Sequence, residues 1–268
     1  MTIENDDIKS STGSQTVARA IQVLRLVACG QELGVRLTDI VQMSGLNRPT
    51  VHRILKTLQA EDAIEQDTMS RRYRIGPEIS LLGIARTRRF PLMSVAGTSL
   101  AQLAQSVGDT AFISIRHRLD SICIGRQTGN HPIQVLSIAV GARRPLGIGV
   151  SGVALLSCLT QSEAEAITQL NSRRLALHGL TADAILDRVI EARQSGYAYT
   201  GTGVMLHTSA VAVPVISDTG EPLAALTITA MTDRLTPERL ASVVALMQAQ
   251  AQSIGHQYSE QHRLSQGD

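Results

Sequence analysis

The spacing of apolar residues over the first ninety positions predicts a small helical region followed by a strand hairpin. From Val17 to Ala28 apolar side chains recur every three or four positions, which is the period of an amphipathic helix, and Gly30 can end that helix. Thr38 and Asn47 are placed to act as N-caps of further helices. The predicted elements are helices over residues 15–30, 38–43 and 47–58, short strands over 63–66 and 71–75, and a helix over 78–90.

After Pro91, where we expect the linker, the pattern changes to strands mixed with helices. Runs rich in β-branched residues predict strands, and longer stretches with helical spacing predict helices between them. The predicted strands cover residues 110–117, 121–126, 133–140, 209–216 and 223–230, and the predicted helices cover residues 150–159, 162–170, 181–195 and a long final segment opened by Thr236. Elements mixed in this way are typical of an α+β domain.

Residues 37–57 have the spacing of a helix-turn-helix motif. Gly45 supplies the small residue that a tight turn between two helices needs. Val41 lies four residues before it, and Val51 and Ile54 lie six and nine residues after it, where crossing helices need apolar contacts. A basic hairpin follows at once, so the sequence predicts a winged helix-turn-helix.

The second helix of such a pair lies in the major groove, and here it is rich in side chains that reach phosphates and base edges. With the wing, the residues predicted to contact DNA are Arg48, Thr50, His52, Arg53, Lys56, Ser70, Arg71 and Arg72. Some alternatives stay open. Arg53 can instead pair with an acidic residue, His52 can pack against the first helix, and the whole region can be a helical bundle with a solvated basic face.

The charge of the chain indicates an anion-binding N-terminal part only when it is counted separately for the two parts of the sequence. The 268 residues carry a net charge of +2, which indicates nothing about partners. Residues 1–90 hold 13 Lys and Arg against 10 Asp and Glu, a net of +3, whereas residues 91–268 hold 12 against 13, a net of −1. The basic excess therefore lies in the part that contains the helix-turn-helix pattern.

Composition excludes several other classes of protein. With 43% hydrophobic residues the chain can bury a core, and no apolar run approaches the roughly 18 residues of a membrane span. The polar start, residues 1–14, is expected to be a disordered tail and neither a signal nor a transit peptide. Cys29, Cys123 and Cys158 lie far apart in apolar stretches, so we expect buried thiols in a cytoplasmic protein.

One motif points to a different function. Residues 147–152, GIGVSG, match the G-x-G-x-x-G expression, and read literally they favour an NAD-dependent enzyme. A dinucleotide site needs a strand before the glycines and an acid at the end of the next strand. We expect neither here, since Arg143 and Pro145 precede the loop and the nearest acid, Glu163, falls in a helical stretch. A helix start that binds an anion remains possible for this loop.

In ordered strings along most of its length, residues 14–258, the chain resembles the IclR family of bacterial transcriptional regulators. The matching strings are AIQVL at residues 20–24, LNRPTVHRIL at 46–55, YRIG at 73–76, RQSGYA at 193–198, VPV at 213–215 and LTPERL at 235–240. The resemblance implies an α+β protein with an N-terminal winged helix-turn-helix and a C-terminal GAF-like effector-binding domain built on an antiparallel sheet. It also implies dimers or tetramers on roughly palindromic double-stranded operators.

The resemblance also implies where the effector binds. By this resemblance, Val150 and Ser151 in the glycine loop are expected to contact the effector. Thr227 and Thr229 correspond to two serines that meet the effector carboxylate in relatives, and their spacing of two directs both to one face of a strand. The alternative is that threonines simply form strands well. The chain departs from the family pattern at Gly147, Val153 and Ala210, and residues 200–207 lack the family's acid.

Further candidates for the effector site come from residue chemistry alone. Arg126 ends a predicted strand and can neutralise a carboxylate, or form an ion pair within the fold. Phe112 can form a wall of the pocket, or belong to the core. Arg143 and Arg144 are expected on the surface. With only 2% aromatic residues the pocket should be aliphatic and hydroxyl-lined.

Together these patterns predict a DNA-binding regulator and not an enzyme. The family resemblance implies a repressor of a catabolic operon, controlled by a small organic acid, and an activator, an NAD-dependent enzyme and a protein-binding adaptor are the alternatives. No metal site or cofactor is expected, because the histidines are scattered without ligand spacing. The expected parts are a tail (1–14), the winged helix-turn-helix (15–76), a linker helix (77–91), the effector domain (92–260) and a C-terminal tail (261–268).

Overall fold

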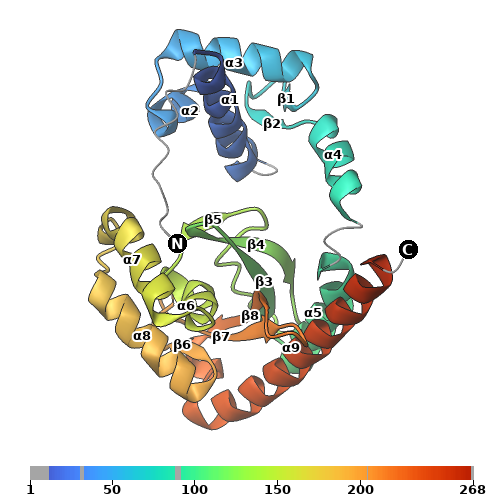
Figure 1. The fold of residues 1–268 in the computed structure, drawn as a ribbon, viewed down its shortest axis with the longest axis vertical. Helices are drawn as coiled ribbons and strands as arrows, with labels where there is room; N and C mark the ends of the chain where they lie inside the picture. Colours follow the sequence, from blue (N-terminus) through green and yellow to red (C-terminus); the bar gives the residue numbers. More distant parts are fainter. Residues whose placement is uncertain (1–11, 31–32, 88–91, 204, 267–268) are drawn as a thin grey trace. The chain divides into compact units, whose positions relative to one another are not determined.

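The computed structural model describes residues 12–30, 33–87, 92–203 and 205–266, and the chain divides into two compact units (Figure 1). The N-terminal unit is Met1–Thr87 and the C-terminal unit is Arg88–Asp268. Most of the tail expected over residues 1–14, and the linker expected at Pro91, lie outside the described residues. Within the described part no helix is long and apolar enough to span a membrane.

The N-terminal unit is a three-helix core closed by a two-stranded antiparallel sheet. Its elements are α1 (Thr12–Cys29), α2 (Leu37–Ser44), α3 (Arg48–Ala60), β1 (Ile64–Gln66), β2 (Tyr73–Ile75) and α4 (Pro77–Thr87). Its buried apolar side chains come from all three helices and both strands. The sequence therefore predicted the number and order of these elements correctly.

Details of this unit differ from the prediction. The residues of α1 that are buried are Val23 and Val27, whereas Val17 is 64% exposed. On α2 the fully buried side chain is Ile40, which the prediction did not name, and the predicted Val41 is half-buried and packs against the same core. The N-cap of α2 is Arg36 and not Thr38, and Cys29 is exposed.

The C-terminal unit contains a six-stranded antiparallel sheet in the order β5-β4-β3-β8-β7-β6. Its strands are β3 (Thr110–His117), β4 (Asp120–Gln127), β5 (Arg143–Pro145), β6 (Ala198–Thr200), β7 (Thr208–Ile216) and β8 (Pro222–Met231). Its helices are α5 (Leu92–Val107), α6 (Gly149–Ser157), α7 (Gln161–Ala176), α8 (Ala182–Ser195), the short 3-10 helix η2 (Thr232–Arg234) and α9 (Pro237–Gln266).

Helices cover both faces of this sheet (Figure 1). On one face α5 and α9 pack against the apolar side chains of β3, β7 and β8, among them Leu226 and Ile228. On the other face a second apolar cluster joins α6, α7 and α8 to Ala225 and Ala212. Strand β8 is therefore buried on both sides, and successive residues along it face different helices.

Three sequence predictions fail in this unit. Residues 133–140 form no strand, and the apolar side chains Ile133, Leu136 and Val140 are 45–57% exposed, so their spacing was not a burial pattern. Helix α5 was not predicted, although its buried residues recur at helical spacing. The tail expected over residues 261–268 is helical as far as Gln266, because α9 continues without a break.

A buried carboxylate joins the end of the sheet to α9. Asp109, with 2% of its side chain exposed, accepts hydrogen bonds from Arg234 Nε at 2.7 Å and from Arg239 Nη1 at 3.1 Å. Arg239 also donates to the carbonyl oxygens of Val107 and Arg234. One ionised group thus connects α5, β3, η2 and α9, and its hydrogen bond raises the pKa of Arg234.

Asp109→Ala is expected to lower the free energy of unfolding of the C-terminal unit by roughly 2–4 kcal/mol, because it leaves two guanidinium groups without their acceptor. Urea denaturation followed by circular dichroism measures this, since the chain has no tryptophan. Asp218→Ala is the control, because that carboxylate pairs with Arg263 but is 42% exposed, and its loss should cost less than about 1 kcal/mol. Equal losses in the two variants would contradict the role of Asp109.

Candidate nucleic-acid interface and effector cavity

The turn between α2 and α3 is built from residues suited to its backbone. Gly45 ends α2 with a φ of 68°, in the left-handed region that glycine adopts without strain. Asn47 then caps α3 as predicted, because its side-chain oxygen accepts a 2.9 Å hydrogen bond from the backbone N–H of Thr50. Pro49 lies in the first turn, so α3 begins at a defined residue and presents its side chains in a fixed direction.

The tip of the β1–β2 hairpin is held by Asp67. Its carboxylate accepts hydrogen bonds of 2.7 Å from both the backbone N–H and the hydroxyl of Ser70, and these lower the pKa of Asp67. Arg71 follows with a φ of 56°, and its backbone N–H donates to the carbonyl of Asp67. The hairpin is therefore organised by its own hydrogen bonds, with the side chain of Arg71 exposed.

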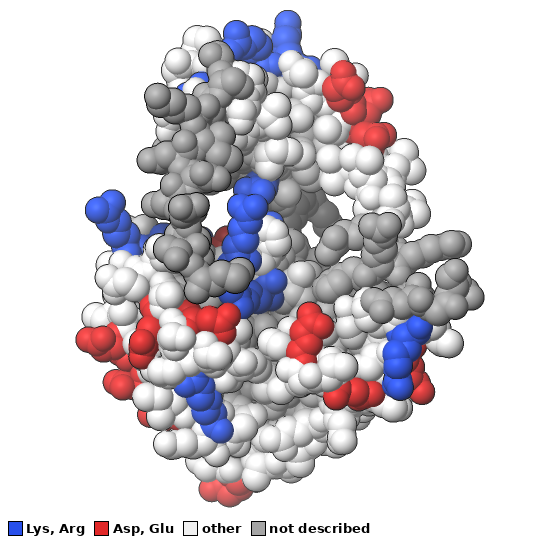
Figure 2. All heavy atoms as spheres, in the orientation of Figure 1, with Lys and Arg blue, Asp and Glu red and all other residues white. Residues whose placement is uncertain are grey.

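A groove of about 540 Å³ lies between the start of α3 and this hairpin. Of the residues predicted to contact DNA, the structure brings Arg48, His52, Ser70 and Arg71 to its lining. Sequence reasoning missed Arg36 and Gln66, which also line it, and only the proximity of the turn and the wing in three dimensions reveals them. In the face shown in Figure 2, basic side chains gather over the α3 end of this unit.

The remaining predicted contacts lie elsewhere on the same unit. Arg53 and Lys56 are exposed on α3 but outside the groove, and Thr50 is half-buried. Among the described residues, none offers Arg53 an acidic partner within ion-pair distance. The exposed side chain of His52 is not packed in the core.

Arg72 differs from the other predicted contacts. Its guanidinium donates a 2.9 Å hydrogen bond to the carbonyl of Gly34, and the side chain is half-buried. This bond ties the hairpin to the segment before α2. Arg72 therefore stabilises the packing of the hairpin within the unit. Its position at the start of a predicted strand did not indicate this role.

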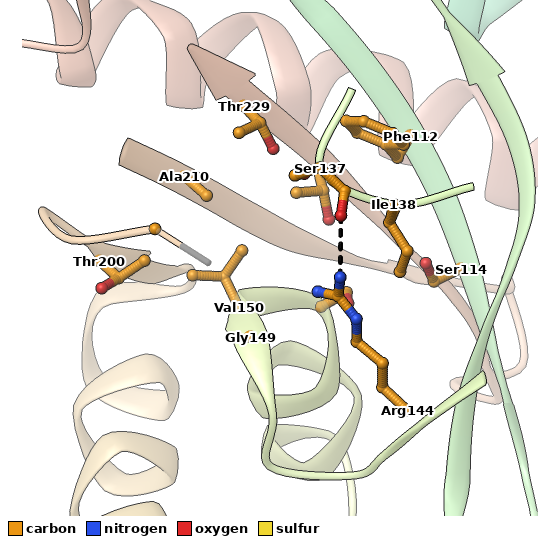
Figure 3. A pocket seen from close by; sticks show the side chains of 13 residues that line it. Phe112, Ser114, Ser137, Ile138, Arg144, Gly149, Val150, Thr200, Ala210 and Thr229 are labelled. Carbon is orange, nitrogen blue, oxygen red and sulfur yellow. Dashed lines mark hydrogen bonds between the residues drawn. The ribbon is translucent and has the colours of Figure 1, made fainter. Parts of the chain in front are cut away.

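The C-terminal unit contains a cavity of about 40 Å³ between the sheet and the start of α6 (Figure 3). Its lining comes from seven separate stretches of the chain: Phe112, Ser114, Ser137, Ile138, Arg144, Gly149, Val150, Ser151, Thr200, Gly203, Ala210, Thr227 and Thr229. Strand pairing explains the sheet side of this set, because Phe112 lies opposite Thr227 and Ala210 lies opposite Thr229. Paired residues of antiparallel strands point to the same face.

The structure thus gathers five of the six predicted effector residues, Val150, Ser151, Thr227, Thr229 and Phe112, around one cavity. The sixth, Arg126, is exposed and does not line it. The expectation that Arg144 lies on the surface is wrong. Residues alternate along β5, so Arg143 reaches Asp120, 3.7 Å away, while the half-buried Arg144 lines the cavity.

The glycine motif has a structural explanation. Gly147 has a φ of 103°, and a Cβ on Gly152 would lie 2.8 Å from the backbone nitrogen of Gly147, so the glycines allow a tight entry into α6. A strand, β5, does precede the loop, contrary to our expectation. That strand has three residues and pairs antiparallel with β4, so the parallel strand–helix–strand unit of a dinucleotide site is not formed here.

The polar groups of the cavity suit a small hydrogen-bonding ligand. Thr227 is 7% exposed, and its hydroxyl has no hydrogen-bond partner among the described residues. Arg144 donates from Nη2 to the carbonyl of Ser137 at 2.8 Å (Figure 3). The described residues of the lining include no acidic side chain. Searching the described residues reveals no cluster of His, Cys, Asp and Glu that could hold a metal ion.

Comparison with known proteins identifies both units. Residues 16–68 match the model of the IclR helix-turn-helix domain, and residues 84–256 match that of the bacterial transcriptional regulator IclR C-terminal domain. The HTH-type transcriptional repressor AllR of Salmonella typhimurium is 28% identical over 245 residues, which cover 90% of this chain and 89% of that protein.

Solved structures agree with these matches. An IclR transcriptional regulator from Alicyclobacillus acidocaldarius superimposes with a TM-score of 0.74 at 26% identity, over 91% of this chain and 98% of that one. An IclR homologue from Microbacterium hydrocarbonoxydans, solved with 4-hydroxybenzoate, has the same fold, with a TM-score of 0.71 at 19% identity over 93% of this chain and 99% of that one. The chain belongs to the IclR family of DNA-binding transcriptional regulators.

Proposed function

We propose that this regulator is a repressor of a catabolic operon and that a small organic acid, bound in the cavity of the C-terminal unit, controls it. The observation that carries the proposal is the convergence of hydroxyl groups and one arginine on a cavity in which none of the described lining residues is acidic. The name of the AllR relative supports repression. An activator is the alternative, and the sign of the change in transcription when the acid is added distinguishes the two.

The proposed mechanism is a shift of population between two arrangements of the protein. An acid that binds one arrangement more tightly favours it, and helix α4 (Pro77–Thr87), which precedes the connection between the units, carries that preference to the DNA-reading units. Binding of the acid and binding of the operator are then coupled in both directions.

We further propose that the chain acts as a homodimer or a tetramer on a roughly palindromic operator. Leu81, Leu82 and Ile84 on α4 are 59–66% exposed, and Val17 and Ile21 on α1 are 64% and 42% exposed. Exposed apolar side chains on each of these two helices support association with a second copy. Two copies related by a two-fold axis read two half-sites of a palindrome.

A thermal-shift screen tests the effector proposal. Acetate, lactate, pyruvate, benzoate and 4-hydroxybenzoate are suitable probes, the last because a relative was solved with it. A ligand that binds only the folded protein raises its Tm as its concentration increases. No shift with any of these acids at millimolar concentration would contradict the proposed ligand class.

Arg53→Ala is expected to weaken operator binding by roughly 1–3 kcal/mol if Arg53 makes a bidentate contact to a base. An operator selected from random duplexes allows a gel-shift titration of affinity and of base preference. Arg116→Ala, an exposed arginine of the C-terminal unit, is the control and should bind as the parent does. Unchanged affinity and base preference in Arg53→Ala would remove that residue from the interface. Separately, DNA binding by the parent protein that does not weaken as the salt concentration rises would favour the adaptor alternative.

The double variant Thr227→Val, Thr229→Val is expected to abolish the effector response while operator binding persists, because valine keeps the shape but removes both hydroxyls from the cavity. Calorimetry with the acid identified in the screen measures the lost affinity. Thr219→Val, in an exposed turn outside the cavity, is the matched control. Undiminished acid affinity in the double variant would exclude both hydroxyls from the site.

A further inference from the structure

The side chain of Arg144 is an unusual component of the cavity. It comes from the edge strand β5 and points toward Ser137 and Ile138, with its guanidinium inside the lining (Figure 3). Its hydrogen bond to Ser137 joins it to a neutral carbonyl, and the salt bridges among the described residues do not include it. A guanidinium has five N–H donors, so most of its donors remain available.

The rest of the lining also favours a negative charge. Gly149, Val150 and Ser151 form the first turn of α6, a helix of nine residues, and backbone N–H groups at a helix start attract anions. Burial lowers the pKa of Arg144, so a bound anion beside the guanidinium would favour its charged form. Among the residues that the structure describes, neither the sheet nor the 133–140 segment adds a carboxylate to the lining.

The sheet side of the lining offers a different kind of contact. The hydroxyl of Thr227 is buried without a partner, so a bound molecule with an oxygen or nitrogen near it would satisfy it. A cavity of about 40 Å³ accommodates only a few non-hydrogen atoms, since one water needs about 10–15 Å³ by this measure. The complementary ligand is therefore short and has a charged end and a polar end.

We propose that Arg144 is the residue that selects anionic effectors, by donating two hydrogen bonds to the ligand's carboxylate. In this arrangement the carboxylate lies at Arg144 and not at the threonine pair to which the resemblance assigns it, and the ligand's other polar group reaches Thr227. This inference rests on the proposed effector site and adds the origin of its charge specificity. The carbonyl of Ser137 and the ligand both accept hydrogen bonds from the Arg144 guanidinium. A bound ligand therefore also affects the 133–140 segment, whose residues Ser137 and Ile138 form part of the lining. Arg126 has no part in this selection.

The test compares each short acid with its neutral amide, using acetate and acetamide, and lactate and lactamide. Calorimetry on the full-length protein should give at least about tenfold tighter binding of an acid than of its amide. In Arg144→Gln we expect the acid to bind roughly 10- to 100-fold more weakly, with the amide nearly unaffected, so that the preference disappears. Arg144→Lys, which keeps the charge, should recover part of the preference.

Arg188→Gln is the matched control. Arg188 is also half-buried and its pKa is also lowered by burial, but it lies on α8 and lines a different groove. This variant should keep the acid preference of the parent. Circular dichroism establishes that each variant is folded, and because the comparison is between two ligands, general loosening of the protein would weaken both and leave their ratio unchanged.

The outcomes separate the two proposals. Failure of every acid to bind the parent protein would overturn the effector site and the role of Arg144 with it. Binding of acids to the parent and to Arg144→Gln with the same preference over amides would leave the site intact and overturn the role of Arg144. The role of Arg144 is supported if Arg144→Gln loses the preference for acids over amides, Arg144→Lys recovers part of it and Arg188→Gln keeps all of it.

Discussion

A strand that is buried on both faces must divide its side chains between two environments. In β8, Leu226 and Ile228 pack against α5 and α9, and the alternate residues Thr227 and Thr229 face α6. Because side chains alternate along a strand, these two sets cannot exchange without a one-residue shift of register. The apolar core and the polar cavity of the C-terminal unit are thus two consequences of the same strand, and pairing with β3 and β7 extends both to neighbouring strands.

The two candidate sites use arginine in opposite ways. On the N-terminal unit Arg48 and Arg71 are exposed beside a groove, where water and salt screen them and affinity comes from many contacts. Arg144 is partly removed from water, so a single anion beside it interacts more strongly and has more effect on specificity. A surface that binds a long polyanion needs the first arrangement, and a cavity for a small anion needs the second.

Much of the fold could be predicted from local signals. The capped helix at Asn47, the glycine at the turn, the hairpin wing and the β7–β8 pair all have short-range signatures, and each is present in the structure. Prediction failed where a local pattern did not correspond to burial, as in residues 133–140. It also failed at α5, whose periodic apolar residues were overlooked next to the expected linker. The G-x-G-x-x-G motif at residues 147–152 shows that a short sequence motif can reflect a backbone geometry without identifying the ligand.

The sequence by itself determined that the chain has a winged helix-turn-helix followed by an α+β domain, because helical periods, caps and alternation are properties of neighbouring residues. Of the thirteen residues that line the cavity it indicated five, four of them through the family resemblance. Only the tertiary structure decided which arginine faces the cavity. Arg126, Arg143 and Arg144 all lie at or near strand ends and are chemically equivalent in the sequence. Their environments differ because strand pairing, the alternation along β5 and the covering segment 133–140 combine residues that are far apart in the chain.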